Sequence, residues 1–213
     1  MNDLAAALAR LTDRTGVTLA WARVAGDGPR AASAAGARAA RDALAAAGCA
    51  GGEVQGHADD GRPLWPAGFT GSISHTDVAA VAAAVACGAT VGAVGVDVER
   101  SGALPAGDAV AVLGEQERAL VRAHARPDWL ATVLWSAKES AFKAWSSATV
   151  GNLGRVDPVD ITVELDERTA SLVVRAHGAL GSATAAVGDA SGAYTEVDGY
   201  IVTLVVVPRS APG

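Results

Sequence analysis

An apolar stretch, AVGVDVER at residues 93–100, limits the folds open to this chain. Its small and β-branched residues predict a buried strand, because only a core can cover so continuous an apolar run. Asp97 and Glu99 stand two positions apart near its end. Side chains alternate along a strand, so both carboxylates lie on one face. This fold must therefore bring two like charges together beside its core.

Two interpretations of this acid pair are open. A strand end that reaches solvent, with Arg100 as counter-charge, explains Asp97 and Glu99 without any ligand. Alternatively, two carboxylates spaced about 7 Å along one strand face can close on a hard cation. Mg²⁺ prefers such oxygen ligands and completes its shell with water and phosphate oxygens. The second interpretation calls for a third acid from another part of the chain.

The rest of the chain mixes strands and helices in both halves. Apolar periodicity predicts helices over residues 1–14, 32–48, 115–125 and 128–146. Strands are predicted over residues 17–25, within 65–75, and over 200–208, with hairpins at 78–100 and 160–178, whereas 188–199 has the composition of a loop. The linker SGALPAGD at 101–108 divides the chain into predicted halves 1–100 and 101–213.

Composition excludes several classes of protein. The chain has 213 residues and a formal net charge of −6, which disfavours nucleic acid as a partner. Cys49 and Cys87 have neither metal-ligand spacing nor the density of a disulfide framework, which fits a reducing compartment. Because no signal sequence or bilayer-spanning run is evident, we expect a cytoplasmic protein with no membrane partner.

The stretch WSAKESAFKAW, residues 135–145, can supply the third acid. On a helix, Glu139 and Lys143 are four positions apart and share a face. The adjoining face carries Trp135, Lys138, Phe142 and Trp145. An ordinary Glu–Lys helix pair beside a core-facing aromatic stripe is the simpler interpretation. A carboxylate between lysines also suits a site where a metal ion and a phosphate meet.

Two further stretches could bind an anion. GSISHT, residues 71–76, combines exposed backbone amides with Ser74 and His75, although a polar turn explains it equally. Arg38 and Arg41 on the helix at 32–48 form either a phosphate clamp or a solvated face.

The motifs GRPLWPAGFTGSISHT, GVDVER and WSAKESAFKAW, in this order and spacing, resemble those of the 4′-phosphopantetheinyl transferases. The resemblance is to the larger surfactin- and enterobactin-synthetase type and covers residues 36–145. It implies an α/β (α+β) fold with a pseudo-twofold pair of similar halves. Each half is a small, mostly antiparallel sheet packed with helices, and the active site lies in the cleft between them.

The resemblance also implies roles for individual residues. The implied Mg²⁺ ligands are Asp97, Glu99 and Glu139, with Glu139 also the general base. The implied coenzyme A contacts are Arg41, Ser74, His75, Lys138 and Lys143, with Lys143 also catalytic at the pyrophosphate. Two departures stand out: Ala37 occupies a position where the family often has arginine, with Arg38 next to it, and residues 146–157 lack the Tyr-Pro and Phe of related sequences.

The implied reaction is Mg²⁺-dependent transfer of 4′-phosphopantetheine from coenzyme A to a serine of an apo acyl or peptidyl carrier protein. We expect a monomer that releases adenosine 3′,5′-bisphosphate. A metal-dependent nucleotide phosphohydrolase and a non-catalytic carrier-binding protein remain as alternatives. Arg118 and Arg122, four apart on the helix at 115–125, are either a docking patch for the carrier or a solvated face balanced by glutamates.

Overall fold

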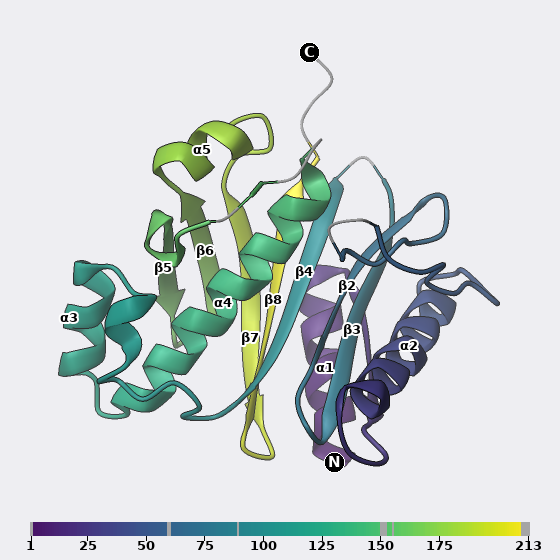
Figure 1. Cartoon of the computed structure of the whole chain (residues 1–213), viewed down its shortest axis with the longest axis horizontal. Coiled ribbons are helices and arrows are strands. Elements are labelled where there is room, and N and C mark those ends of the chain that lie inside the picture. The colour runs from purple at the N-terminus through teal and green to yellow at the C-terminus, as the bar shows by residue number, and fades with distance from the viewer. Residues whose placement is uncertain (1, 59–60, 89, 150–152, 155, 210–213) are drawn as a thin grey trace.

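A computed structural model describes residues 2–58, 61–88, 90–149, 153–154 and 156–209. These residues form two antiparallel sheets covered by helices (Figure 1). The three-stranded sheet has the order β1 (Thr18–Arg23), β3 (Ala79–Ala86), β2 (Phe69–His75). The five-stranded sheet has the order β4 (Val91–Arg100), β8 (Tyr200–Pro208), β7 (Ala190–Val197), β6 (Ser171–Ala176), β5 (Ile161–Asp166).

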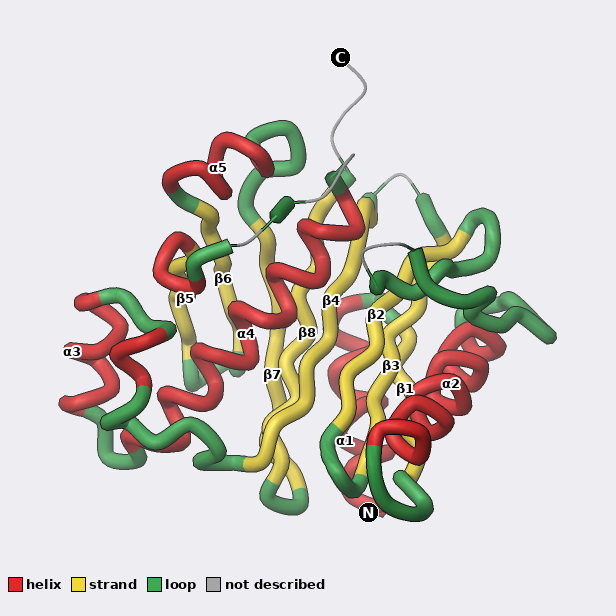
Figure 2. Tube along the Cα trace, in the orientation of Figure 1, coloured by secondary structure: helices red, strands yellow, loops and turns green. Residues whose placement is uncertain are grey.

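The α-helices are α1 (Asn2–Thr15), α2 (Pro29–Ala46), α3 (Glu115–Ala123), α4 (Pro127–Ala148) and α5 (Gly178–Thr184). Two short 3₁₀ helices, η1 (Ala109–Ala111) and η2 (Pro158–Asp160), lie in the connections. Figure 2 shows α4 crossing the front of the five-stranded sheet, while α2 lies outside the three-stranded sheet. No helix in the described part of the chain is long and apolar enough to span a membrane.

The acid-bearing strand β4 pairs with β8, and Asp97 lies directly opposite Thr203. Its side chains alternate between two cores: Val94, Val96 and Val98 pack with α1 on one face, and Ala93 packs with the α4 core on the other. Because both faces are covered, the strand is almost continuously apolar. Asp97 has the same parity as Ala93 and therefore lies on the α4 face.

The predicted hairpin at 78–100 is wrong. β3 is the central strand of the three-stranded sheet and pairs with β1 and β2, whereas β4 pairs with β8. The short connection between β3 and β4 thus crosses from one sheet to the other. Apolar periodicity reports which residues form strands but not which strands pair. Asp97 and Glu99 consequently lie in the five-stranded sheet. The division into halves 1–100 and 101–213 stays a prediction.

The two sheets meet where β2 runs beside β4 (Figure 1). Their contact is made by side chains, since the backbone ladders of β2 and β4 go to β3 and β8 respectively. α1 covers the back of this junction, because Leu4, Leu8 and Leu11 contact a core that includes residues of both sheets. The junction places the ends of β2 and β4 side by side and so positions the site.

The mixed α/β architecture with antiparallel sheets is confirmed. So are the four predicted helices, the hairpin at 160–178 and the last buried strand. The predicted loop at 188–199 is wrong, because residues 190–197 form β7 between β6 and β8. Its glycine and polar residues hide the strand pattern, and pairing on both sides overrides their low β-propensity. The pseudo-twofold relation between the halves stays a prediction.

Gly95 sets the distance between α4 and β4. A Cβ at this position would clash with the backbone oxygen of Ser140 and lie 2.8 Å from the backbone nitrogen of Ala144. Since the obstacle is helix backbone, no side-chain rotation relieves it. Any larger residue must push α4 away from the strand.

Gly95→Ala should therefore lower the free energy of unfolding by roughly 1–3 kcal/mol, the usual cost of overpacking a core. Urea unfolding of the purified variant measures this change. Gly107→Ala is the matched control, because nothing lies within 4 Å of a Cβ built there. Equal stability of the two variants would contradict the close-packing argument.

Candidate active site

The Asp97 carboxylate is the centre of a polar cluster between β2, β4 and α4. Its Oδ1 accepts hydrogen bonds from Ser74 Oγ at 2.8 Å and Lys143 Nζ at 2.7 Å. Its Oδ2 accepts from Ser136 Oγ at 2.9 Å. With only 4% of its surface exposed, Asp97 depends on these donors for solvation. The cluster therefore joins one residue from each of β2 and β4 to two from α4.

Lys143 connects the cluster to open space. Its ammonium also donates to the Val96 carbonyl at 3.2 Å, and its side chain is 28% exposed in the ion pair with Asp97. The same residue lines a large cavity. Lys143 thus stands between the buried carboxylate and any anion in that cavity.

Glu99 and Glu139 share the electrostatic environment of Asp97. Burial, with the neighbouring Asp97 charge second, raises the pKa of Glu99 from 4.5 to about 7, against the opposing effect of Lys143. Burial is also the main cause that raises the pKa of Glu139, where Lys143 lowers it and Asp97 raises it. The three acids therefore repel one another, with Lys143 as their common counter-charge.

The three acids do not converge as a coordination shell. Within the described residues, no group of three His, Cys, Asp or Glu side chains is arranged to hold a metal ion. The Lys143 ammonium supplies the positive charge beside Asp97 instead. The three side chains still suit a hard cation, because carboxylate oxygens are its preferred ligands. A cation would also offset the repulsion among the three carboxylates when all are ionised.

A cavity of about 640 Å³ opens beside this cluster. Its walls come from the first half of α2, the loop before β2, β2 itself and the end of α4. Basic and imidazole groups face it from three of these walls: His57, Arg62, His75 and Lys143. A cavity of this size, with the Arg62 guanidinium, the Lys143 ammonium and two imidazoles, suits a drug-sized anionic ligand.

A smaller pocket of about 130 Å³ lies nearer the start of α4, and Lys138 is among its lining residues. Glu139 lines it together with the rings of Trp135 and Phe142, and Phe142 also lines the large cavity. Glu139 therefore faces a mostly apolar recess that is adjacent to the cationic cavity.

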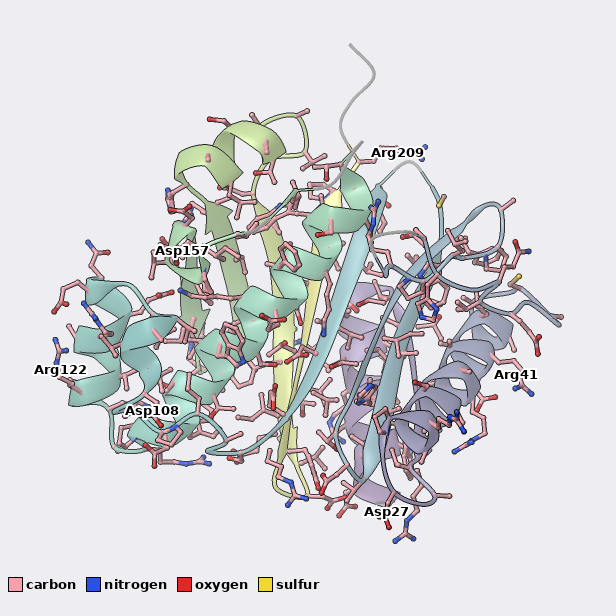
Figure 3. All side chains as sticks on the ribbon, in the orientation of Figure 1. Asp27, Arg41, Asp108, Arg122, Asp157 and Arg209 are labelled. Atoms are coloured by element: carbon pink, nitrogen blue, oxygen red, sulfur yellow. The ribbon has the colours of Figure 1, made fainter. Side chains whose placement is uncertain are left out.

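The structure brings together most of the predicted site residues, though not all. Ser74 contacts Asp97 rather than lining the cavity, and His75 lines the cavity. Arg41 lies on the outer side of α2 (Figure 3), half exposed, with its Nε 3.4 Å from Glu53 Oε1. α2 instead contributes Ser33, Gly36 and Ala37 to the cavity wall.

Lys138 is separate from the cluster. Its ammonium is buried and donates to Glu117 Oε2 at 2.6 Å, the Val112 carbonyl at 2.9 Å and the Pro158 carbonyl at 3.0 Å. Burial lowers the pKa of Lys138, and the Glu117 carboxylate opposes this effect. Three acceptors match the three N–H donors of an ammonium, so Lys138 has no donor to spare for a ligand.

Sequence reasoning missed several residues of the site. His57 and Arg62 come from a loop that glycine and aspartate composition predicts. Arg62 stands in the motif GRPLWPAGFTGSISHT, but no role was predicted for it, and it also donates to the Ser146 carbonyl at the end of α4. Thr203 lies behind Asp97, in contact with Ser136. Thr203 did carry a signal, because it is the polar residue within the apolar strand YIVTLVVVP.

Arg118 and Arg122 both pair with Glu115, Arg122 Nη2 at 3.0 Å from Glu115 Oε1. Figure 3 shows Arg122 on α3, at the side of the molecule opposite Arg41. Two arginines thus share one surface carboxylate, because the other glutamate of α3, Glu117, is buried against Lys138. Both interpretations of this helix face stay open.

Comparison with known proteins identifies the family. A model of the 4′-phosphopantetheinyl transferase superfamily matches residues 93–205. A model of the 4′-phosphopantetheinyl transferase N-terminal domain matches residues 21–86. The chain belongs to the 4′-phosphopantetheinyl transferase superfamily. The boundary between the two matches falls between β3 and β4, where the chain crosses from one sheet to the other.

Two relatives carry the same family name. The 4′-phosphopantetheinyl transferase Npt of Nocardia iowensis is 34% identical over 115 residues, which is 54% of this chain and 51% of that protein. The 4′-phosphopantetheinyl transferase Svp of Streptomyces mobaraensis is 34% identical over 155 residues, 71% of this chain and 61% of that protein. The matches thus span between one half and two thirds of each relative.

Two solved structures are partly similar. The holo-[acyl-carrier-protein] synthase of Thermotoga maritima has a TM-score of 0.44 and 25% identity, over 55% of this chain and 63% of that chain. The ACPS-CoA complex of Chronobacterium ammoniagenes has a TM-score of 0.46 and 22% identity, over 59% of this chain and 100% of that chain.

The raised pKa of Glu99 predicts a pH-dependent stability. The folded state holds the Glu99 proton more tightly than the unfolded state, where the pKa is near 4.5. Its stabilising contribution is therefore complete below about pH 4.5 and is lost as the pH rises through about 7. Glu99→Gln keeps the neutral form at every pH.

We expect Glu99→Gln to melt at a higher temperature than the parent protein above pH 7 in EDTA. The difference should shrink toward pH 5, where the parent Glu99 is protonated. Thermal melts from pH 5 to 8.5 measure it, with Glu53→Gln on the exposed surface as control. Parallel melting curves for the Glu99 variant and the parent across this range would contradict the assignment.

Lys138→Met tests the structural role of Lys138. The variant leaves the Glu117 carboxylate buried without its counter-charge, which should cost about 3–5 kcal/mol of unfolding free energy. Arg168→Met is the control, since that arginine is 84% exposed beside Asp166 and a surface pair is worth at most about 1 kcal/mol. Denaturant unfolding compares the two, and equal losses would show that the buried pair contributes little.

Proposed function

We propose that this protein transfers 4′-phosphopantetheine from coenzyme A to a serine hydroxyl of an apo acyl or peptidyl carrier protein. The observation that carries the proposal is Lys143, which contacts the buried Asp97 carboxylate and lines the cationic cavity. A phosphoryl group held there meets acids and an ammonium together. Membership of the transferase superfamily and the named activity of its relatives support the same reaction.

Coenzyme A has the properties that the cavity selects for. Its pyrophosphate and 3′-phosphate supply the negative charge that Arg62, Lys143 and the two cavity histidines would pair with. The volume of about 640 Å³ lies in the range for a ligand of drug size. The mostly apolar recess beside Phe142 and Trp135, with a volume of about 130 Å³, would take part of the uncharged pantetheine arm.

Asp97, Glu99 and Glu139 are the residues that would hold Mg²⁺. Their carboxylate oxygens are the ligands that Mg²⁺ prefers. A divalent cation between them would also offset the repulsion among the three carboxylates. When bound, the ion would supply charge neutralisation at the transferring phosphoryl group. Lys143 already performs part of that neutralisation at Asp97.

In the proposed reaction, Glu139 accepts the proton and Lys143 stabilises the leaving group. The acceptor serine oxygen forms a bond to the β-phosphorus of coenzyme A as the bond from that phosphorus to the bridging oxygen breaks. Glu139 takes the serine proton, a role that its raised pKa favours. Lys143 stabilises the negative charge that develops on the departing adenosine 3′,5′-bisphosphate.

We propose that the protein works as a cytoplasmic monomer.

The test uses the whole protein with coenzyme A, Mg²⁺ and a panel of apo carrier proteins, read by intact mass. Addition of phosphopantetheine to a carrier supports the proposal. Hydrolysis of coenzyme A without any carrier would favour a phosphohydrolase. Absence of both reactions with every carrier in the panel would favour a carrier-binding protein without catalysis.

Glu139→Gln separates catalysis from binding. We expect its kcat to fall by roughly 10²–10⁴-fold, the usual loss of a general base, with coenzyme A affinity by calorimetry nearly unchanged. Arg30→Ala, on the exposed start of α2, is the control and should match the parent protein. If affinity for coenzyme A falls in step with kcat, Glu139 is a binding group and another residue is the base.

A further inference from the structure

Behind Asp97, three buried hydroxyls form a continuous chain between α4 and β8. Ser140 Oγ lies 2.7 Å from Thr203 Oγ1, and Thr203 Oγ1 lies 2.9 Å from Ser136 Oγ. Ser136 Oγ in turn donates to Asp97 Oδ2 at 2.9 Å. All three residues are fully buried. No residue that lines the cavity takes part, so these three hydroxyls reach Asp97 from the core side.

Each hydroxyl has one proton, and this fixes the direction of the bond from Ser136 to Asp97. An ionised carboxylate only accepts, so Ser136 must donate to Asp97 and can then only accept from Thr203. Ser140 has acceptors at both Thr203 Oγ1 and the Thr203 carbonyl, the latter at 3.1 Å. Thr203 can give its proton to Ser136 Oγ or, at 2.9 Å, to the Ser136 carbonyl. Whichever acceptors Thr203 and Ser140 take, the Ser136 proton is left for Asp97, and Thr203 holds the Ser136 side chain from behind.

Core packing alone does not call for these hydroxyls. Thr203 is directly opposite Asp97 in the β4–β8 ladder, and its neighbours on the same face of β8, Ile201 and Val205, are apolar. A valine would have the same shape as Thr203 without an oxygen that needs a partner. Buried hydroxyls are costly unless they are bonded. Here Thr203 and Ser140 bond to backbone carbonyls as well as to neighbouring hydroxyls, and the contacts of the three hydroxyls end at the Asp97 carboxylate.

The two oxygens of Asp97 consequently have different surroundings. Oδ1 is held by Ser74 and by Lys143, which is the residue in contact with the cavity. Oδ2 is held by Ser136 and the chain behind it. We infer that Ser136, Thr203 and Ser140 are positioning residues that fix the rotation of the Asp97 carboxylate, so that Oδ1 faces Lys143 and the cavity.

The inference rests on the proposed function only for its kinetic consequence. Thr203→Val removes the central hydroxyl at constant shape, and Thr203→Ser keeps it. We expect Thr203→Val to lower kcat of the transfer about 10–100-fold, the usual cost of losing a residue that orients a site ligand. The KM for coenzyme A should stay within about twofold of the parent value, because the cavity wall is untouched. Thr203→Ser should recover most of kcat.

The matched control is Thr184→Val, which removes an equally buried hydroxyl that bonds only to the Leu180 carbonyl of α5. It should leave kcat unchanged. A purely structural role of Thr203 predicts that Thr203→Val and Thr184→Val behave alike, or that Thr203→Ser rescues nothing. Either result overturns the inference.

A second measurement does not depend on catalysis. Crystal structures of Thr203→Val and Ser136→Ala should show the Asp97 carboxylate rotated, with its Oδ1 contact to Lys143 lost or lengthened. An unchanged carboxylate in both variants overturns the inference even if the parent enzyme is fully active. A rotated carboxylate supports it even if the parent protein transfers nothing, a result that would count against the proposed function alone. Either crystal structure suffices should the other variant fail to fold.

Discussion

The close packing of α4 on β4 at Gly95 is the contact on which the site depends. Because the strand has no side chain there, the backbone of the helix at Ser140 and Ala144 lies directly on the strand. Ser136, one turn before Ser140, and Lys143, within the contacting turn, are then placed against Asp97. A helix held farther out would leave the Asp97 carboxylate without two of its three donors, in a place that water barely reaches.

Electrostatics explains why this arrangement suits a ligand-binding site better than a core. Three acids with one lysine among them carry a net negative charge in a partly buried place, and the raised pKa values of Glu99 and Glu139 record the cost. A core selected only for stability would replace such a group with apolar residues. Under the proposed function, a cation bound by the acids would relieve this repulsion and leave Lys143 for a phosphate.

The sequence predicted those parts of the site that depend on local spacing. The shared face of Asp97 and Glu99 follows from strand alternation, and the shared face of Glu139 and Lys143 follows from helical pitch. The pairing of β4 with β8 and the presence of Thr203 behind Asp97 depend on contacts distant in sequence, which no local pattern encodes. Arg62 was missed for a related reason: its loop has no periodicity, and only the fold shows that it reaches the end of α4.

Helical geometry alone shows that Lys138 and Lys143 cannot both contact one ligand from the same face of α4. Lys138 is five positions before Lys143, a rotation of about 140° around the helix axis, so the two lysines cannot share a face. Lys143 turns toward the acids, while Lys138 turns toward Glu117 on α3, and Glu117 also accepts from the Val163 amide of β5. α4 is therefore held on one side by the Gly95 contact and on the other by a buried ion pair. Rotation of the helix about its axis would break both, so the same residues that stabilise the helix also keep Glu139 and Lys143 directed at the site.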